Sequence, residues 1–144
     1  MGTDIHLRAQ VRWQGEWHDE VIPDELLGWR NYSVFAALAG VRNSDDVPPI
    51  HTPRGLPDDL RGSEQDPAEV ADCCHDTSWL TLAELQAYDW EGPAWQGRRS
   101  CWTDDGPQEV PIHTFTRHWR QTFLPFLARL GPPEAVRIVF FFDC

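Results

Sequence analysis

Residues 135–142 are the most apolar segment of the chain, because valine, isoleucine and phenylalanine follow one another there almost without interruption. The segment comes after Gly131-Pro132-Pro133, which ends any preceding helix. A continuous apolar run of this length predicts a buried strand in the centre of a sheet. The rest of the chain therefore has to supply strands beside it and helices that cover it.

A second strand is predicted over residues 4–13, where alternate side chains are apolar and share one face: Ile5, Leu7, Ala9, Val11 and Trp13. Residues 14–16 have the composition of a turn, and residues 17–22 form a second short strand, so this part of the chain is expected to be a hairpin. The first and the last predicted strands are the two most strand-like segments. We therefore expect them to be neighbours in one sheet.

Two helices are predicted from their ends and their apolar faces. Asn31 can cap a helix over residues 32–38, and Gly40 can end it. A longer helix is predicted over residues 114–130, because an apolar stripe runs along its length. Pro125 falls inside this segment and should kink the helix.

A third helix is predicted over residues 82–88, where Thr81-Leu82-Ala83-Glu84 has the pattern of a capping box. Leu80 and Leu85 stand at the positions of a hydrophobic staple around it. The third helix would therefore begin at Leu82.

The remaining segments have weaker patterns. Residues 41–66 show no periodicity and are rich in proline and aspartate, so we expect a long irregular loop. Asp66-Pro67-Ala68-Glu69 predicts a short helix to about Cys73, and residues 91–112 predict a loop or hairpin. The sequence as a whole predicts a single α+β domain over residues 1–144, with a small mixed or antiparallel sheet packed by about three helices.

The charge balance limits the partners of the chain. It carries 12 basic and 23 acidic residues, a net charge of −11, and every basic residue is arginine. Arginine without lysine is typical of a GC-rich genome, such as that of an actinobacterium or its phage. An acidic surface repels nucleic-acid polymers and anionic lipid at long range, whereas a local arginine cluster can still bind a small anion. We therefore expect a small anionic ligand or substrate, and neither a nucleic-acid polymer nor a membrane.

The sequence also predicts a cellular compartment. It opens without the basic start and apolar stretch of a signal peptide, and its longest apolar run is too short to span a bilayer. The four cysteines include no Cys-x-x-Cys pair, so neither a disulfide framework nor a thiolate zinc site is indicated. These features predict a cytoplasmic protein with reduced thiols, and they leave the formation of a homo-oligomer open.

Three polar residues fall at the ends of the two strands that are expected to pair. Asp4 and His6 are two residues apart and so share one face of the first strand, while Asp143 ends the last strand. A carboxylate and an imidazole presented together can bind a divalent metal, or act as a base with its orienting partner. If the strands pair, these three residues could converge. The alternative is an ordinary polar strand end.

A fourth metal ligand is expected from His75. The predicted metal site then consists of Asp4, His6, His75 and Asp143. Two carboxylates and two imidazoles suit Zn²⁺, Mn²⁺ or Fe²⁺ better than Mg²⁺. The alternative for the segment around His75 is helix capping by Asp76 or Ser78.

Arg30, His51 and Arg54 are the candidates for catalytic and anion-binding roles. Arg30 precedes a predicted helix start, where free backbone N–H groups favour anions. Arg54 follows a proline and precedes a glycine, which suits a rigid presentation of its guanidinium to a carboxylate or phosphate. Pairing of Arg54 with Asp58 or Asp59 is the alternative and carries equal weight.

Five ordered blocks carry a resemblance to a known family. They are Gly2-Thr3-Asp4-Ile5-His6, Arg30-Asn31-Tyr32 with 35–43, Pro53-Arg54-Gly55-Leu56-Pro57, Ser78-Trp79-Leu80-Thr81, and 136–143. The chain resembles an uncharacterised family of small phage, prophage and bacterial proteins that open with Met-Gly-Cys-Asp-Ile-His or a close variant. The resemblance covers nearly the whole chain and brings no established function. Because the shared blocks are richer in polar residues than packing requires, they support a true site.

The chain departs from the family pattern at three places. Thr3 stands where cysteine is frequent, and Cys144 stands where asparagine is usual. Where many members have His-Ser-His-Ser-Trp, this chain has His75-Asp76-Thr77-Ser78-Trp79, so one of two histidines is missing. If the family site is a metal site built on both histidines, Asp76 would have to substitute for the second.

Three functions follow as hypotheses. The favoured one is a metal-dependent enzyme of hydrolase or lyase type that acts on a small anionic, for example nucleotide-like, substrate. The second is a non-catalytic protein of phage or actinobacterial origin that binds and sequesters a small ligand. The third is a protein-interaction module whose contact surface is the tryptophan-rich region 90–102.

Overall fold

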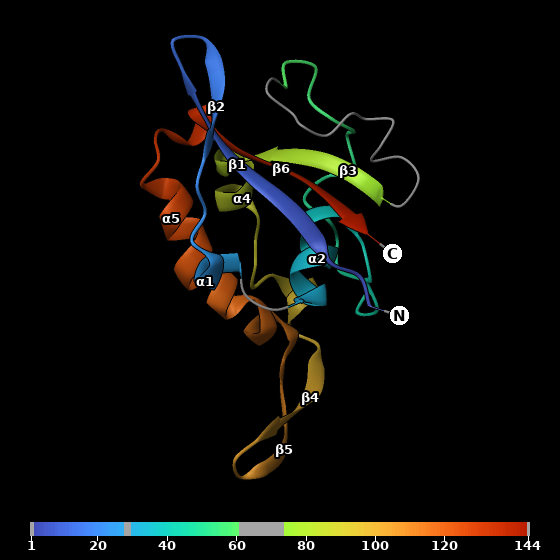
Figure 1. Cartoon of the computed structure of the whole chain (residues 1–144). Helices are drawn as coiled ribbons and strands as arrows, with labels where there is room; N and C mark the ends of the chain where they lie inside the picture. Colours follow the sequence, from blue (N-terminus) through green and yellow to red (C-terminus); the bar gives the residue numbers. More distant parts are fainter. Residues whose placement is uncertain (1, 28–29, 61–73, 144) are drawn as a thin grey trace.

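The computed structural model describes residues 2–27, 30–60 and 74–143, and its centre is a four-stranded antiparallel sheet (Figure 1). The strand order is β2-β1-β6-β3. In chain order these strands are β1 (Ile5–Trp13), β2 (Glu16–Glu20), β3 (Cys74–Thr81) and β6 (Val136–Asp143). The apolar segment near the C-terminus is therefore a central strand, as the sequence predicts, with a neighbour on each side.

The strands β1 and β6 are direct neighbours. They pair from Ile5 opposite Phe142 to Val11 opposite Val136. The pairing extends one step further, because the N–H of Asp143 donates to the carbonyl oxygen of Asp4 at 3.0 Å. The start of β1 and the end of β6 lie side by side (Figure 1). The expected adjacency of the first and last strands is confirmed.

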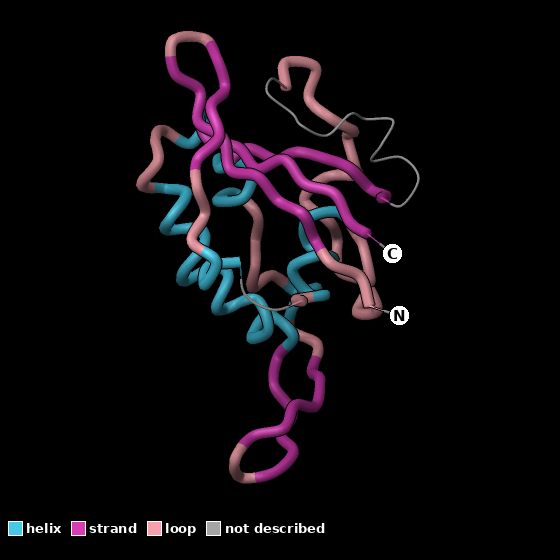
Figure 2. Tube along the Cα trace, viewed as in Figure 1, coloured by secondary structure: helices cyan, strands magenta, loops and turns pink. Residues whose placement is uncertain are grey.

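Helices cover one face of this sheet (Figure 2). They are α1 (Asp24–Leu27), α2 (Tyr32–Ala39), α4 (Leu82–Ala87) and α5 (Leu124–Ala128). Phe140 and Phe142 of β6 are fully buried, and the ring of Phe142 lies 5.1 Å from the ring of Phe35 on α2. Full burial of such a side chain contributes about 1.5–3 kcal/mol, so these contacts hold α2 to the strand end that carries Asp143.

The predicted helix caps are confirmed. The side chain of Asn31 accepts a hydrogen bond from the N–H of Val34 at 3.2 Å, and Gly40 ends α2 in the left-handed conformation, with φ of 74°. Thr81 and Glu84 form the reciprocal hydrogen bonds of a capping box before α4. Short-range sequence patterns fix both helices, because caps use only neighbouring residues.

The helical segment before β6 is not one regular α-helix. A 3₁₀ turn (Ile112–Thr116) precedes a π-helical turn (Trp119–Phe123), which leads into α5. Within it, the N–H of Leu124 bonds to the carbonyl of Trp119, five residues earlier. Pro125 has no N–H to donate and its ring would clash with the carbonyl four residues before it, so the extra residue of the π-turn relieves this conflict.

The strand β3 was not predicted, and the alternative interpretation of its segment, a helix cap at Asp76 or Ser78, is wrong. It pairs with β6 through Trp79 opposite Val139, and the register shifts between His75 and Ser78. Asp76, inside this bulge, has a positive φ of 52°. The polar composition and the bulge interrupt the two-residue period, which is why the sequence pattern did not reveal a strand.

The remaining predictions for local structure fall into two groups. Residues 41–60 contain no helix or strand, as expected for the long loop, and the short helix predicted over residues 66–73 lies outside the described residues. Region 91–112 contains a 3₁₀ turn (Pro93–Trp95) and the hairpin β4 (Arg98–Thr103) and β5 (Gly106–Pro111), which projects from the body of the protein (Figure 1). In the part of the chain that is described, no helix is long and apolar enough to cross a bilayer.

The second face of the sheet is packed by the loop. Arg137 of β6 is only 3% exposed, and its Nε donates to Gln10 at 2.8 Å while its Nη1 pairs with Asp59 of the loop at 2.8 Å. Its guanidinium also lies 4.0 Å from the ring centroid of Trp17. The loop is thus tied to the sheet by a buried cation, which costs free energy unless it is paired in this way.

Candidate functional site

A chain of hydrogen bonds joins four polar residues where β1 begins and β6 ends. We call this group, Asp4, His6, Arg30 and Asp143, the terminal corner. Asp143 Oδ1 accepts from the backbone N–H of Asp4 at 2.9 Å, and Asp143 Oδ2 lies 2.9 Å from His6 Nε2. The Asp4 carboxylate accepts from Arg30 Nε at 2.5 Å and from Arg30 Nη2 at 3.0 Å. Three of the four predicted metal ligands and one predicted anion-binding residue therefore meet.

Strand register explains most of this arrangement. Asp4 precedes Ile5 and Asp143 follows Phe142, and Ile5 and Phe142 are a strand pair. The two aspartates are therefore the next residues to face each other across the two strands. His6 lies opposite Phe141, and the two rings stack with centroids 4.8 Å apart and planes 12° apart. This stacking fixes the plane of the imidazole, while Asp143 fixes its rotation.

The charges of the corner stabilise one another. The hydrogen bond from Arg30 lowers the pKa of Asp4, and the pKa of Arg30 is raised in return. The hydrogen bond from His6, together with the backbone N–H of Asp4, lowers the pKa of Asp143. Both carboxyl groups are therefore ionised at neutral pH. The side chain of His6 is 49% exposed and that of Arg30 is 51% exposed, so both can be reached by a small molecule.

A second layer of residues holds the corner in place. A Cβ on Gly2 would lie 1.7 Å from Arg30 Nη1, so any larger residue would displace the guanidinium. The buried Thr3 donates its N–H to the Tyr32 hydroxyl at 3.1 Å and accepts from Arg42 Nε at 3.0 Å. No sequence pattern predicts a role for these residues, although all of them belong to the blocks that carry the family resemblance.

His75 does not join the corner. It lies opposite Phe142, whereas His6 lies opposite Phe141, and successive residues of a strand point to opposite faces. Its Nδ1 lies 2.6 Å from Asp76 Oδ2. Among the described residues, no group of three or more His, Cys, Asp or Glu side chains is arranged to hold a metal ion. The predicted four-ligand site is therefore not assembled in this conformation.

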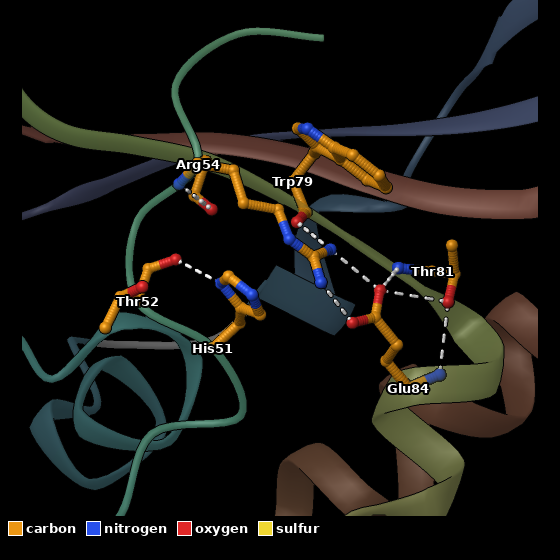
Figure 3. A network of polar contacts seen from close by, with 7 residues as sticks. His51, Thr52, Arg54, Trp79, Thr81 and Glu84 are labelled. Atoms are coloured by element: carbon orange, nitrogen blue, oxygen red, sulfur yellow. Dashed lines mark hydrogen bonds and ion pairs between the residues drawn. The ribbon is translucent and has the colours of Figure 1, made fainter.

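Arg54 is engaged in a separate network (Figure 3). Its guanidinium pairs with both carboxylate oxygens of Glu84, at 2.8 and 2.5 Å, and donates to the carbonyl of Trp79 at 3.1 Å. It also stacks on the Trp79 ring at 4.4 Å and is only 18% exposed. His51 is exposed and its Nδ1 lies 2.6 Å from the carbonyl oxygen of Thr52. The ion pair of Arg54 with Glu84 therefore connects the loop to α4, and we call this pair the clamp. Its geometry fits this structural role better than it fits an anion site.

The clamp makes stability depend on pH. Arg54 lowers the pKa of Glu84 to about 2, below its ordinary value of 4.5. Because the folded pKa is the lower one, the contribution of this group is complete above about pH 4.5 and is lost as the pH falls towards 2. A Glu84→Gln variant should therefore lose about 1–3 kcal/mol of unfolding free energy at about pH 6 and much less at about pH 3.

Urea unfolding of the wild type and the Glu84→Gln variant at both pH values measures this difference. Glu134→Gln changes an exposed carboxylate and is the matched control, with a small effect at either pH. An equal loss at both pH values for Glu84→Gln would contradict the role of the charge.

Comparison of the chain with protein-family models, with curated proteins and with solved structures finds no match. The family resemblance therefore stays a prediction. The function has to be inferred from the residues of the site and their surroundings.

A cavity of about 770 Å³ opens beside the terminal corner, on the helix-covered side of the sheet. Arg30 belongs to both the corner and the cavity, and Ile5, which lies between Asp4 and His6 in β1, lines the cavity. The volume is within the range of small-molecule sites, about 300–1,000 Å³. The corner thus has space for a ligand next to it.

The tryptophan-rich region does not form the single surface that the interaction hypothesis requires. Trp90 and Trp95 are 7% and 1% exposed and belong to the core. Trp102, on the projecting hairpin, is 83% exposed. This part of the hypothesis is corrected, because two of the three tryptophans contribute to packing and cannot contact a partner.

Proposed function

We propose that the protein is an enzyme of hydrolase or lyase type, acting on a small anionic substrate at the terminal corner. The observation that carries the proposal is the His6–Asp143 pair, an exposed imidazole oriented by an ionised carboxylate and by a stacked ring. Such a pair is the usual form of a general acid–base group. Arg30, at the edge of the cavity, supplies the positive charge for the substrate.

The hydrogen-bond pattern assigns the protons of this pair. An ionised carboxylate can only accept, so Nε2 of His6 must carry the proton that it shares with Asp143. Nδ1 is then unprotonated in the neutral ring and is free to take a proton from a substrate or a water molecule. Asp143 is itself held by the N–H of Asp4, so the imidazole cannot easily turn away.

Arg30 can bind an anion without losing Asp4. Its Nε and Nη2 face the carboxylate, which leaves the other edge of the guanidinium with N–H donors of its own. The pair with Asp4 orients the fork, and a planar fork suits the oxygens of a carboxylate or phosphate. Asp4 and Arg30 would therefore position the substrate, while His6 transfers the proton.

The metal predicted from the sequence is a testable extension of this proposal. Asp4, His6 and Asp143 have the right donor atoms for Zn²⁺, Mn²⁺ or Fe²⁺. In this conformation, however, Arg30 occupies both oxygens of Asp4, and His6 and Asp143 are bonded to each other. A metal ion would therefore have to displace these hydrogen bonds before Asp4, His6 and Asp143 could bind it.

A substrate panel tests the proposal. The purified protein is assayed with nitrophenyl phosphate, bis-nitrophenyl phosphate, nitrophenyl acetate and nucleoside mono- and triphosphates, each with EDTA, with Zn²⁺ and with Mn²⁺. We expect turnover of at least one anionic substrate and a loss of about 100-fold or more in Asp143→Asn. Asp105→Asn, on the tip of the β4–β5 hairpin, is the control and should keep full activity.

The same panel decides whether a metal is needed. Activity that survives EDTA supports acid–base catalysis by the chain alone, and activity restored only by Zn²⁺ or Mn²⁺ supports the metal-dependent form. Equal rates for the wild type and Asp143→Asn would overturn the proposed function in either form.

Sequestration of a ligand without turnover is the second candidate, and the cavity next to Arg30 is the observation that favours it. In this case a small molecule should accompany the protein through purification. Mass spectrometry of the supernatant after heat denaturation would detect it in stoichiometric amount, and the substrate panel would show no turnover.

A further inference from the structure

We infer that the cavity beside the terminal corner is a nucleotide site, in which the base lies on an apolar floor and the phosphate reaches Arg30. This inference deepens the proposed function, because it rests on the same corner and names the class of its substrate. It depends on three features of the cavity: the buried side chains of its floor, an unpartnered N–H on one of these side chains, and charged side chains around its rim.

The floor of the cavity is apolar and partly aromatic. Val34 and Phe35 of α2 and Trp119 of the π-turn are all buried and all line it. Both rings already pack on other aromatic rings, so a flat heterocycle would contact the small part of each that is exposed to the cavity. A floor of this kind favours a planar ring over a flexible sugar or a bare inorganic anion.

Trp119 also has an unsatisfied polar group. The residue is 8% exposed, and its indole N–H has no hydrogen-bond partner. A buried donor without a partner is unfavourable, and most buried donors in proteins are paired. Since Trp119 lines the cavity, an acceptor nitrogen or oxygen on a bound ring would become this partner once the buried indole edge turns towards the ligand.

The rim carries both acidic and basic side chains. Asp24 and Glu25 of α1 lie on it, and so do Arg30 and His118. All four are exposed. Carboxylates accept hydrogen bonds from the ring N–H and amino groups of a base, whereas a guanidinium and an imidazole N–H donate to phosphate oxygens. A nucleotide carries all of these groups in one molecule, so its chemistry matches the floor and the rim together.

The test uses the four ribonucleoside 5′-monophosphates, their nucleosides and inorganic phosphate as probes of the full-length protein. Binding is measured by isothermal titration calorimetry and by the ¹⁵N-detected shift of the Trp119 indole N–H. We expect at least one monophosphate to bind and to shift this resonance, with its nucleoside binding about tenfold or more weaker. Inorganic phosphate should bind only weakly, since it cannot use the floor.

Variants of the rim residues distinguish the contribution of the phosphate to binding from that of the base. Arg30→Gln should weaken the monophosphate about tenfold or more and leave the nucleoside unchanged. Glu25→Gln should weaken both. Arg117→Gln and Glu20→Gln change exposed side chains that do not line the cavity and are the matched controls, with unaltered affinities.

His6→Gln distinguishes this inference from the proposed function. His6 does not line the cavity, so this variant should bind nucleotides as the wild type does. If no monophosphate binds at millimolar concentration, or if Arg30→Gln binds with unaltered affinity, the inference fails even when His6-dependent turnover of another anion is found. If nucleotides bind as expected and His6 affects no reaction, the inference stands and the proposed function fails.

Discussion

In a His6→Gln variant, kcat/KM should fall by about 100-fold or more on whichever substrate the wild type turns over, because positioned acid–base groups contribute about 10²–10⁴ in rate. Glutamine keeps a similar size and an N–H donor for Asp143, but it cannot take up and release a proton near neutral pH. The His6 side chain is 49% exposed, so the loss of its packing is small. We therefore expect the melting temperature to stay within a few degrees of the wild type.

His18→Gln is the matched control for this variant. His18 is exposed on β2, and its ring contacts Trp13 with centroids 6.2 Å apart, far along the hairpin from the corner. It should keep wild-type kcat/KM. Unchanged activity in His6→Gln, or an equal loss in both variants, would remove His6 from the chemistry.

Phe142→Ala should lower the free energy of unfolding by about 3–5 kcal/mol. We expect no larger loss of stability from any other single residue next to the terminal corner. Phe142 is fully buried, its ring contacts those of Phe35 and Phe140, and it directly precedes Asp143. Its removal leaves a cavity at the point where α2 packs on β6. The total stability of a small domain is about 5–15 kcal/mol, so a loss of this size removes a large part of it and lowers the urea midpoint clearly.

Two further variants make this prediction specific. Phe142→Leu keeps most of the volume and should cost less than about 1.5 kcal/mol, whereas Trp13→Ala removes a large aromatic side chain that is 65% exposed and should cost about 0.5 kcal/mol or less. Urea unfolding gives all three values. A cost for Phe142→Ala as small as that for Trp13→Ala would show that the strand end is not packed as described.

Much of the fold could be predicted because it depends on short-range patterns. The alternation of residues 4–13, the apolar run near the C-terminus and the caps at Asn31 and Thr81 each use neighbouring residues, and all of them correspond to observed elements. The pairing of β1 with β6 is a long-range contact, but it followed from the strength of the two strand patterns. The capping box needed no tertiary information at all.

The parts of the fold that could not be predicted depend on contacts between residues far apart in the chain. The strand β3 has a bulge around Asp76 and a polar composition, and its place is fixed by pairing with β6 and by a hydrogen bond from Gly55 N–H to the carbonyl of Thr77 at 2.8 Å. Arg137 lies within the apolar run and is buried because Gln10 and Asp59 pair with it. No local pattern contains such partners, which lie far away in the chain.

The candidate site, like the fold, could be predicted only in part. Asp4, His6 and Asp143 could be brought together from strand adjacency alone, because the two-residue period fixes which side chains share a face. That Arg30 would bind the Asp4 carboxylate, 26 residues away, depends on how α2 packs and is not visible in the sequence. His75 was misplaced because the bulge in β3 changes the phase of its side chains.

The most direct test of the proposed site is whether His6 and Asp143 interact as a hydrogen-bonded pair. The pKa of Asp143, measured by ¹³C-detected NMR titration in the wild type and in His6→Ala, gives the answer. The hydrogen bond from His6 is the leading cause that lowers this pKa below its ordinary value of 3.8. We predict a value below 3.8 in the wild type and a clear rise in His6→Ala. The same pKa in both proteins would contradict the pairing of His6 with Asp143, and with it the proposed site.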